Sequence, residues 1–156
     1  MALFADGSVT RAVELADDEL WAFREKLLDA LATPQVPSVA LAQACGEFVD
    51  AAGKEAPLRR ARTRQIMTFV ADFYRQVLRV QIGLEPTGDE LLLRAVDMLR
   101  PAAALSAVAA AACVDRTLAA LGHVDRNAHQ ATTIGCWLDD LAQIVDTGHP
   151  LTELEV

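Results

Sequence analysis

Proline and glycine divide this chain into blocks that each have the length of a single helix. Proline removes a backbone donor and glycine readily adopts left-handed backbone, so both residues mark helix boundaries. Of the 156 residues, 53% are hydrophobic but only 5% are aromatic, and alanine and leucine, which favour helix, supply most of the apolar side chains. We therefore expect an all-α protein, a bundle of five to six helices. The breaks fall at Pro34, Pro37, Gly53, Pro57, Pro86, Gly88, Pro101, Gly122 and Gly148.

The spacing of apolar residues predicts the bounds of each helical block. The third block is the longest, and its broad apolar face, from Ile66 to Val80, is typical of a central helix that other helices contact on several sides. The six blocks run from about Ser8 to Leu31, Ser38 to Ala52, Leu58 to Leu84, Asp89 to Leu99, Pro101 to Leu121 and Asn127 to Val145.

Several of these blocks begin with residues that favour a helix N-terminus. Acidic residues prefer a first turn, so the run from Asp17 to Glu19 indicates a helix start within the first block. Pro101 is expected in the first turn of the fifth helix, where its missing N–H is harmless. Asn127, with Gln130 three residues later, resembles a capping box at the start of the sixth.

The common catalytic motifs are absent from the sequence. It contains no GxxxxGK[ST], GxGxxG, GxSxG or HExxH motif, and no Glu-x-x-His pair of the kind that lines di-iron bundles. The three cysteines, Cys45, Cys113 and Cys136, are far apart and form no CxxC pair. We expect buried thiols in a reducing cytoplasm.

Two groups of polar residues are candidates for a functional site. His123, Asp125 and His129 surround a predicted turn between helices, where they form either a metal site or ordinary turn and cap groups. Asp139 and Asp140 stand between inward-facing leucines, so we expect them on a solvated helix face.

The charge of the chain restricts its partners. A formal net charge of −8 argues against general binding to DNA or RNA, which requires basic surface. The local exception is Arg59, Arg60, Arg62 and Arg64 at the start of the third block, where cations oppose the helix dipole. These arginines are candidates for intramolecular pairing, for example with Asp17 to Glu19, or for contact with an acidic partner or a phosphate.

No secretory or membrane signal is visible in the sequence. The N-terminus lacks a signal-peptide pattern, and the low-charge stretch from Pro101 to Val114 is too short to span a bilayer. We therefore expect a cytoplasmic protein without a membrane partner.

The first residues suggest a boundary within a larger protein. Gly7 suits the position just after a helix, and Ser8 suits the N-cap of the next helix. Almost no residues precede Gly7 to form the first of these helices. The pattern is that of a piece cut from a longer chain.

Three segments together resemble a known family. The run from Asp6 to Leu15 resembles the Gly-Ser-x-x-Arg-Ala turn and helix at the end of the lid of bacterial clamp-loader ATPases. The run from Asn127 to Leu141 resembles the last helix of the family's C-terminal domain, and the block from Met67 to Gly83 resembles its central helix. The resemblance covers about residues 3 to 145 and is strongest toward the delta-prime and gamma/tau subunits of DNA polymerase III.

The resemblance implies an assembly role. The chain would comprise an AAA+ lid remnant (residues 1–16), an α-helical collar domain (17–146) and a tail (147–156). Arg11 aligns with the sensor-2 arginine, which reaches toward nucleotide phosphates in ATP-binding members. The family's Walker loop, Ser-Arg-Cys motif and zinc module are absent, so this fragment is not expected to be an enzyme or to hold a cofactor.

The partners that the resemblance implies are the other clamp-loader subunits, gamma/tau and delta, which together load the sliding clamp in DNA replication. Contact with DNA would be indirect, through the complex. The exposed flanks of the long helices would pack against neighbouring collars, with Arg59 to Arg64 setting partner choice. The alternatives are a small all-α metal-binding enzyme built on His123, Asp125 and His129, and an unrelated helical regulator.

Overall fold

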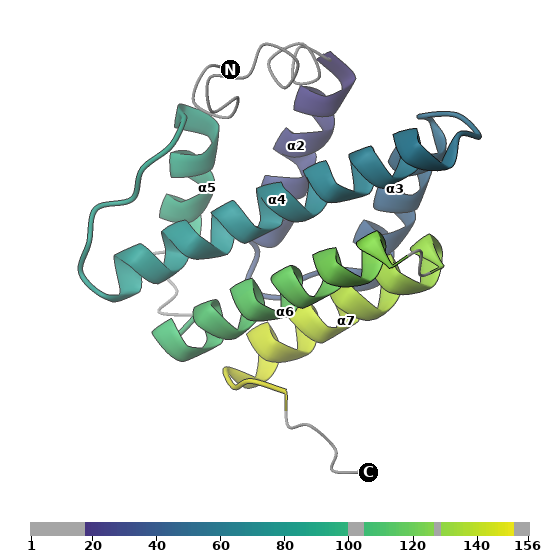
Figure 1. Ribbon diagram of the computed structural model, residues 1–156. Coiled ribbons are helices and arrows are strands. Elements are labelled where there is room, and N and C mark those ends of the chain that lie inside the picture. Colours follow the sequence, from purple (N-terminus) through teal and green to yellow (C-terminus); the bar gives the residue numbers. More distant parts are fainter. Residues whose placement is uncertain (1–17, 100–104, 127–128, 152–156) are drawn as a thin grey trace.

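The structure is a computed structural model that describes residues 18–99, 105–126 and 129–151. These residues form six helices and no strand, which confirms the predicted all-α fold (Figure 1). The helices are α2 (Asp18–Leu31), α3 (Ser38–Asp50), α4 (Ala56–Gln81), α5 (Glu90–Leu99), α6 (Ala107–Asp125) and α7 (Gln130–Thr147).

The long helix α4 crosses the middle of the molecule. It packs against α2, α3, α5 and α6, while α7 packs against α3 and α6 (Figure 1). The prediction of a central helix from its broad apolar face is therefore confirmed. The buried residues of α4 are Thr63, Ile66, Met67, Phe69, Val70, Ala71, Phe73, Tyr74 and Val77.

Helix α6 presents small side chains to the core. Ala109, Ala110, Cys113 and Ala120 are fully buried in it. By length and composition the window from Ala107 to Val124 is apolar enough to cross a membrane, a test that core helices of folded bundles also pass. Here α6 packs against α4 and α7, as a core helix does.

Two predicted helix starts are wrong, and one is confirmed. Helix α6 begins at Ala107, because the hydroxyl of Ser106 caps it by accepting a hydrogen bond from the backbone N–H of Ala109; Pro101 lies outside the described residues. Helix α7 begins at Gln130 with His129 as its cap, so Gln130 is the first helical residue and not the fourth member of a capping box. Asp18 and Glu19 do form the first turn of α2.

The end of α7 follows the sequence pattern. Gly148 adopts left-handed backbone with φ of 72°, and its N–H donates to the carbonyl of Ile144. A residue with a Cβ would be strained at this φ, so glycine suits the end of the helix. The last five residues of the tail, and all of residues 1–16, lie outside the described part of the chain.

A buried chain of hydrogen bonds joins α6 to α7. The indole Nε1–H of Trp137 donates to Thr117 Oγ1 over 3.1 Å, and the Thr117 hydroxyl donates to the carbonyl of Cys113 over 2.8 Å. All three residues are fully buried, so each polar atom needs its partner. The bonds set the register of α7 against α6.

Replacing Thr117 with valine tests this connection. Valine has nearly the same shape but leaves the buried indole N–H without an acceptor, so we expect a loss of about 1–3 kcal/mol in the free energy of unfolding. Urea denaturation followed by circular dichroism measures it. The matched control is Thr147→Val, because the Thr147 hydroxyl also bonds a carbonyl four residues back but is exposed. Equal losses in both variants would contradict the assignment.

Candidate functional site

The arginines at the start of α4 divide into two groups. Arg59 forms an ion pair with Asp50 at the end of α3. Arg62 lies 3.9 Å from Glu19 of α2, donates to the carbonyl of Phe48 over 2.9 Å, and stacks over the Phe48 ring with its guanidinium carbon 4.4 Å from the ring centroid. Intramolecular pairing, including a contact with the acidic start of α2, therefore accounts for these two arginines.

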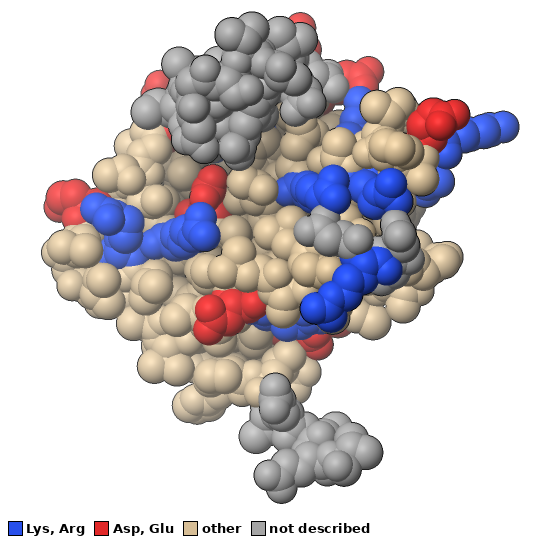
Figure 2. Space-filling view, in the orientation of Figure 1, with Lys and Arg blue, Asp and Glu red and all other residues tan. Residues whose placement is uncertain are grey.

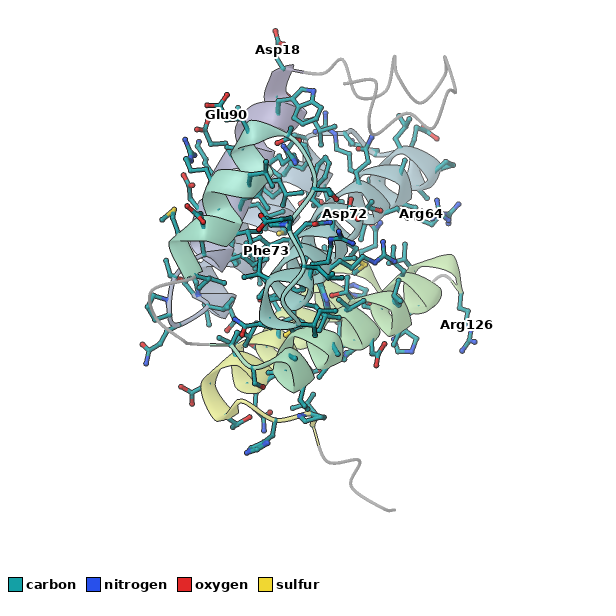
Figure 3. The ribbon with its side chains drawn as sticks, turned by 90° about the vertical axis from the view of Figure 1, so that its left-hand side faces the viewer. Asp18, Arg64, Asp72, Phe73, Glu90 and Arg126 are labelled. Atoms are coloured by element: carbon teal, nitrogen blue, oxygen red, sulfur yellow. The ribbon has the colours of Figure 1, made fainter. Side chains whose placement is uncertain are left out.

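Arg60 and Arg64 lie one turn apart on a more outward face of α4. Arg64 is exposed and Arg60 is half-buried. Arg64 and Arg126, which caps the end of α6, project from the same side of the molecule, whereas Phe73 lies in its interior (Figure 3). Basic side chains gather over this part of the surface (Figure 2). Of the four arginines, Arg64 is therefore the most accessible to a partner.

A second charged centre joins α2 to α5. Arg24 is only 2% exposed, and its Nη1 and Nη2 donate to the two carboxylate oxygens of Asp89 over 3.3 and 2.8 Å. The guanidinium carbon lies 5.0 Å from the ring centroid of Trp21 and 5.2 Å from that of Phe69. Two aromatic faces and a bidentate carboxylate thus surround one buried cation.

Asp89 has a further role at the start of α5. Its Oδ1 accepts a hydrogen bond from the backbone N–H of Leu92 over 3.0 Å, as an N-cap residue does. Gly88 precedes it with φ of 146°, and a Cβ there would stand 2.8 Å from Leu92 Cδ2. The turn into α5 therefore requires glycine, and it holds the Asp89 carboxylate against Arg24.

An open pocket of about 580 Å³ lies beside this ion pair. Charged side chains of both signs line it, and Arg94 is held there by Glu25 and Asp29, at 3.3 and 3.2 Å. The pocket thus has a charged rim, in which Arg24 and Arg94 are paired, beside the Trp21 side chain. The lining residues are Trp21, Arg24, Asp89, Glu90, Leu91 and Arg94.

The reasoning from sequence missed Arg24, although a signal was present. Arg24 falls on the apolar stripe of its helix, between Leu20 and Leu27 at i+4 and i+7 spacing. A charge on such a stripe is almost never buried unless it is paired, so its position called for an acidic partner. That partner, Asp89, is 65 residues away, and only the fold identifies it.

The histidines of the alternative metal site have different surroundings. His129 caps α7, its Nδ1 facing the backbone N–H of Thr132, and His123 is exposed in the last turn of α6. The described residues contain no group of three or more side chains that could hold a metal ion. Arg11 lies outside the described part of the chain.

The paired aspartates of α7 differ from each other. Asp139 is exposed, as predicted for a solvated face, but Asp140 receives a hydrogen bond from Arg116 Nε over 2.5 Å. That ion pair is a second link between α6 and α7, nearer the surface than the Trp137–Thr117 bond. The positive charge of Arg116 is therefore paired within the chain.

Comparison of the chain with protein-family models, with curated proteins and with solved structures finds no match in any of the three.

Replacing Arg24 with methionine tests the α2–α5 centre. Methionine keeps the buried volume but leaves the Asp89 carboxylate without its cation, so we expect a loss of about 2–4 kcal/mol in the free energy of unfolding. Urea denaturation measures the change. Arg94→Met is the control, because Arg94 is a solvent-exposed arginine whose ion pairs contribute little. A similar small change in both variants would show that burial of Arg24 is not important for stability.

The cysteines provide a chemical test of the packing. Burial raises the pKa of Cys45 and of Cys113 to about 12, whereas Cys136 is exposed, contrary to the expectation that all three thiols are buried. A disulfide reagent such as DTNB at pH 8 should therefore modify one thiol rapidly in the folded protein and the other two only after denaturation. A Cys136→Ser variant should lose the fast reaction. Rapid reaction of all three thiols would contradict the fold.

Proposed function

We propose that this chain is an assembly module: the collar-type C-terminal domain of a bacterial clamp-loader subunit of the delta-prime or gamma/tau kind, acting in DNA replication. The observation that carries the proposal is where the family-like segments lie in the fold. Phe73 and Tyr74 come from the central helix α4, and Trp137, Leu138 and Leu141 come from the last helix α7, and all five are fully buried. The segments that resemble the family thus contribute fully buried residues to the core of the helical bundle.

The expected mechanism is protein–protein association. Exposed apolar side chains on the outer helix faces would provide contact area, and Arg60 and Arg64 would provide charge selectivity. The exposed large apolar residues are Val39, Leu58, Ile82, Leu84, Met98, Val108 and Leu118.

In this proposal, nucleotide binding belongs to a different module of the clamp loader. In the family, ATP is bound by the AAA+ module, whose Walker loop this sequence lacks. Arg11 would contribute to a nucleotide site only together with that module. The proposed place of action is the cytoplasm, with DNA reached through the assembled loader and with no membrane partner.

The test is complex formation with purified gamma/tau and delta subunits of the same organism. The chain should co-elute with them in size-exclusion chromatography at micromolar concentration. It should not co-elute with subunits truncated to their AAA+ modules, because the contact is between collars. The absence of any complex with the intact subunits would reject the proposal, and stoichiometric zinc or iron in the purified protein would favour the metal-binding alternative.

The arginine surface offers a second test of the same proposal. Arg64→Glu reverses a charge at an exposed position of α4 and should weaken the complex by about tenfold, mainly through a slower association rate at low salt. Lys26→Glu, on α2, is the matched control, since it makes the same charge change at another exposed position. Surface plasmon resonance at two salt concentrations measures both variants; identical kinetics would remove Arg64 from the interface.

A further inference from the structure

An exposed seam runs along the outer face of α6. Its residues are spaced alternately three and four apart, which is the repeat that keeps one helix face against a partner helix in a coiled coil. Val108 is 59% exposed and Leu118 is 44% exposed, although both are large and apolar. The seam consists of Val108, Ala111, Asp115, Leu118 and Gly122.

The seam opens into a hollow of about 710 Å³ at its N-terminal end. Val108, Ala111 and Ala112 form one wall, Ile144 of α7 contributes to the lining, and Leu151 follows on the other side. Asp115 and Arg116 are the charged residues that line the hollow, and its other lining residues are uncharged. Small side chains along a helix allow a second helix to approach to about 8 Å between axes. The shape and spacing fit a helix.

Asp115 stands at the centre of the seam and carries its charge. It is exposed, and no ion pair joins it to another residue of the described chain. The neighbouring Arg116 also lines the hollow, but its charge is paired with Asp140 of α7. The middle of the seam is therefore negative, and a helix that covers it must present a cation at that point.

The central aspartate also argues against a second copy of the chain as the occupant. In a two-fold dimer through this seam, whether the helices run parallel in register or antiparallel about its centre, Asp115 would meet Asp115 of the other copy. Two carboxylates brought together in an apolar interface repel and lose their hydration. A polar residue at one such position is a known means of excluding wrong pairings.

We propose that the α6 seam is the docking surface for a helix of a different protein, with an apolar stripe and one lysine or arginine opposite Asp115. The identity of the partner rests on the proposed assembly function. If that function holds, the seam is a surface, in addition to the one that includes Arg64, through which the chain meets a neighbouring clamp-loader subunit. The aspartate gives that contact its preference for a different chain over a copy of itself.

The first experiment needs no partner. The wild-type chain should be monomeric in sedimentation velocity at micromolar concentration, and Asp115→Leu, which completes the apolar seam, should strengthen self-association by at least about tenfold. Asp139→Leu makes the same change at an exposed aspartate of α7, outside the seam, and should stay monomeric. A monomeric Asp115→Leu variant, or equal dimerisation of both variants, would overturn the proposal. So would a wild-type dimer that Val108→Asp abolishes.

The second experiment identifies the partner surface. Asp115→Arg and Val108→Asp should each weaken the complex with gamma/tau or delta by at least about tenfold, because a like charge or a buried charge would then face the docked helix. Ala40→Asp, at an exposed position of α3 that lies outside the seam, is the control and should leave the complex unchanged. Circular dichroism verifies that all variants remain folded.

The two proposals fail in different ways. If the wild-type chain binds none of the clamp-loader subunits, the proposed function is rejected. The sedimentation-velocity measurement of self-association still tests the seam in that case. If the complex forms and neither Asp115→Arg nor Val108→Asp weakens it, the seam is rejected and the assembly function stands.

Discussion

Burial of one face of α4 is the interaction on which the other helices depend. This 26-residue helix contacts α2, α3, α5 and α6, and it does so although arginines crowd its N-terminal end. Each such cation opposes the helix dipole by up to about 1 kcal/mol, whereas burying one large apolar side chain contributes about 1.5–3 kcal/mol. With Phe69, Phe73 and Val77 among its buried residues, packing outweighs the dipole, and pairing of Arg59 and Arg62 reduces the remaining cost.

Polar links then fix how the other helices sit around α4. Arg24 and Asp89 hold α2 to α5, while the Trp137–Thr117 hydrogen bond holds α7 to α6. Burial also raises the pKa of Tyr74, and the adjacent Cys113 raises it further, so this part of the core stays uncharged. Apolar packing alone would tolerate small slips between helices. Buried donors and acceptors do not, since an unpaired one costs about 1–3 kcal/mol.

Much of the helix pattern could be predicted from the sequence, because turns and apolar periodicity are local. The predicted blocks match α3, α4 and α5 to within a few residues, and the predicted break at Gly148 coincides with the end of α7. The start of α6 was misplaced because Pro101 is a good first-turn residue, but the hydroxyl of Ser106 caps the helix instead. The start of α7 was misplaced for the same kind of reason, since several polar residues compete for one cap.

The sequence by itself determined the helical class, the central role of α4 and the concentration of arginines at its start. All of these depend on residues near one another in the chain. Only the tertiary structure decided which acidic residues pair with Arg59, Arg62 and Arg24, and which apolar residues of α6 face outward. In the sequence, a charged or apolar residue that contacts its own fold has the same spacing as one that contacts a partner. The packing of helices that are distant in the chain decides which of the two it does.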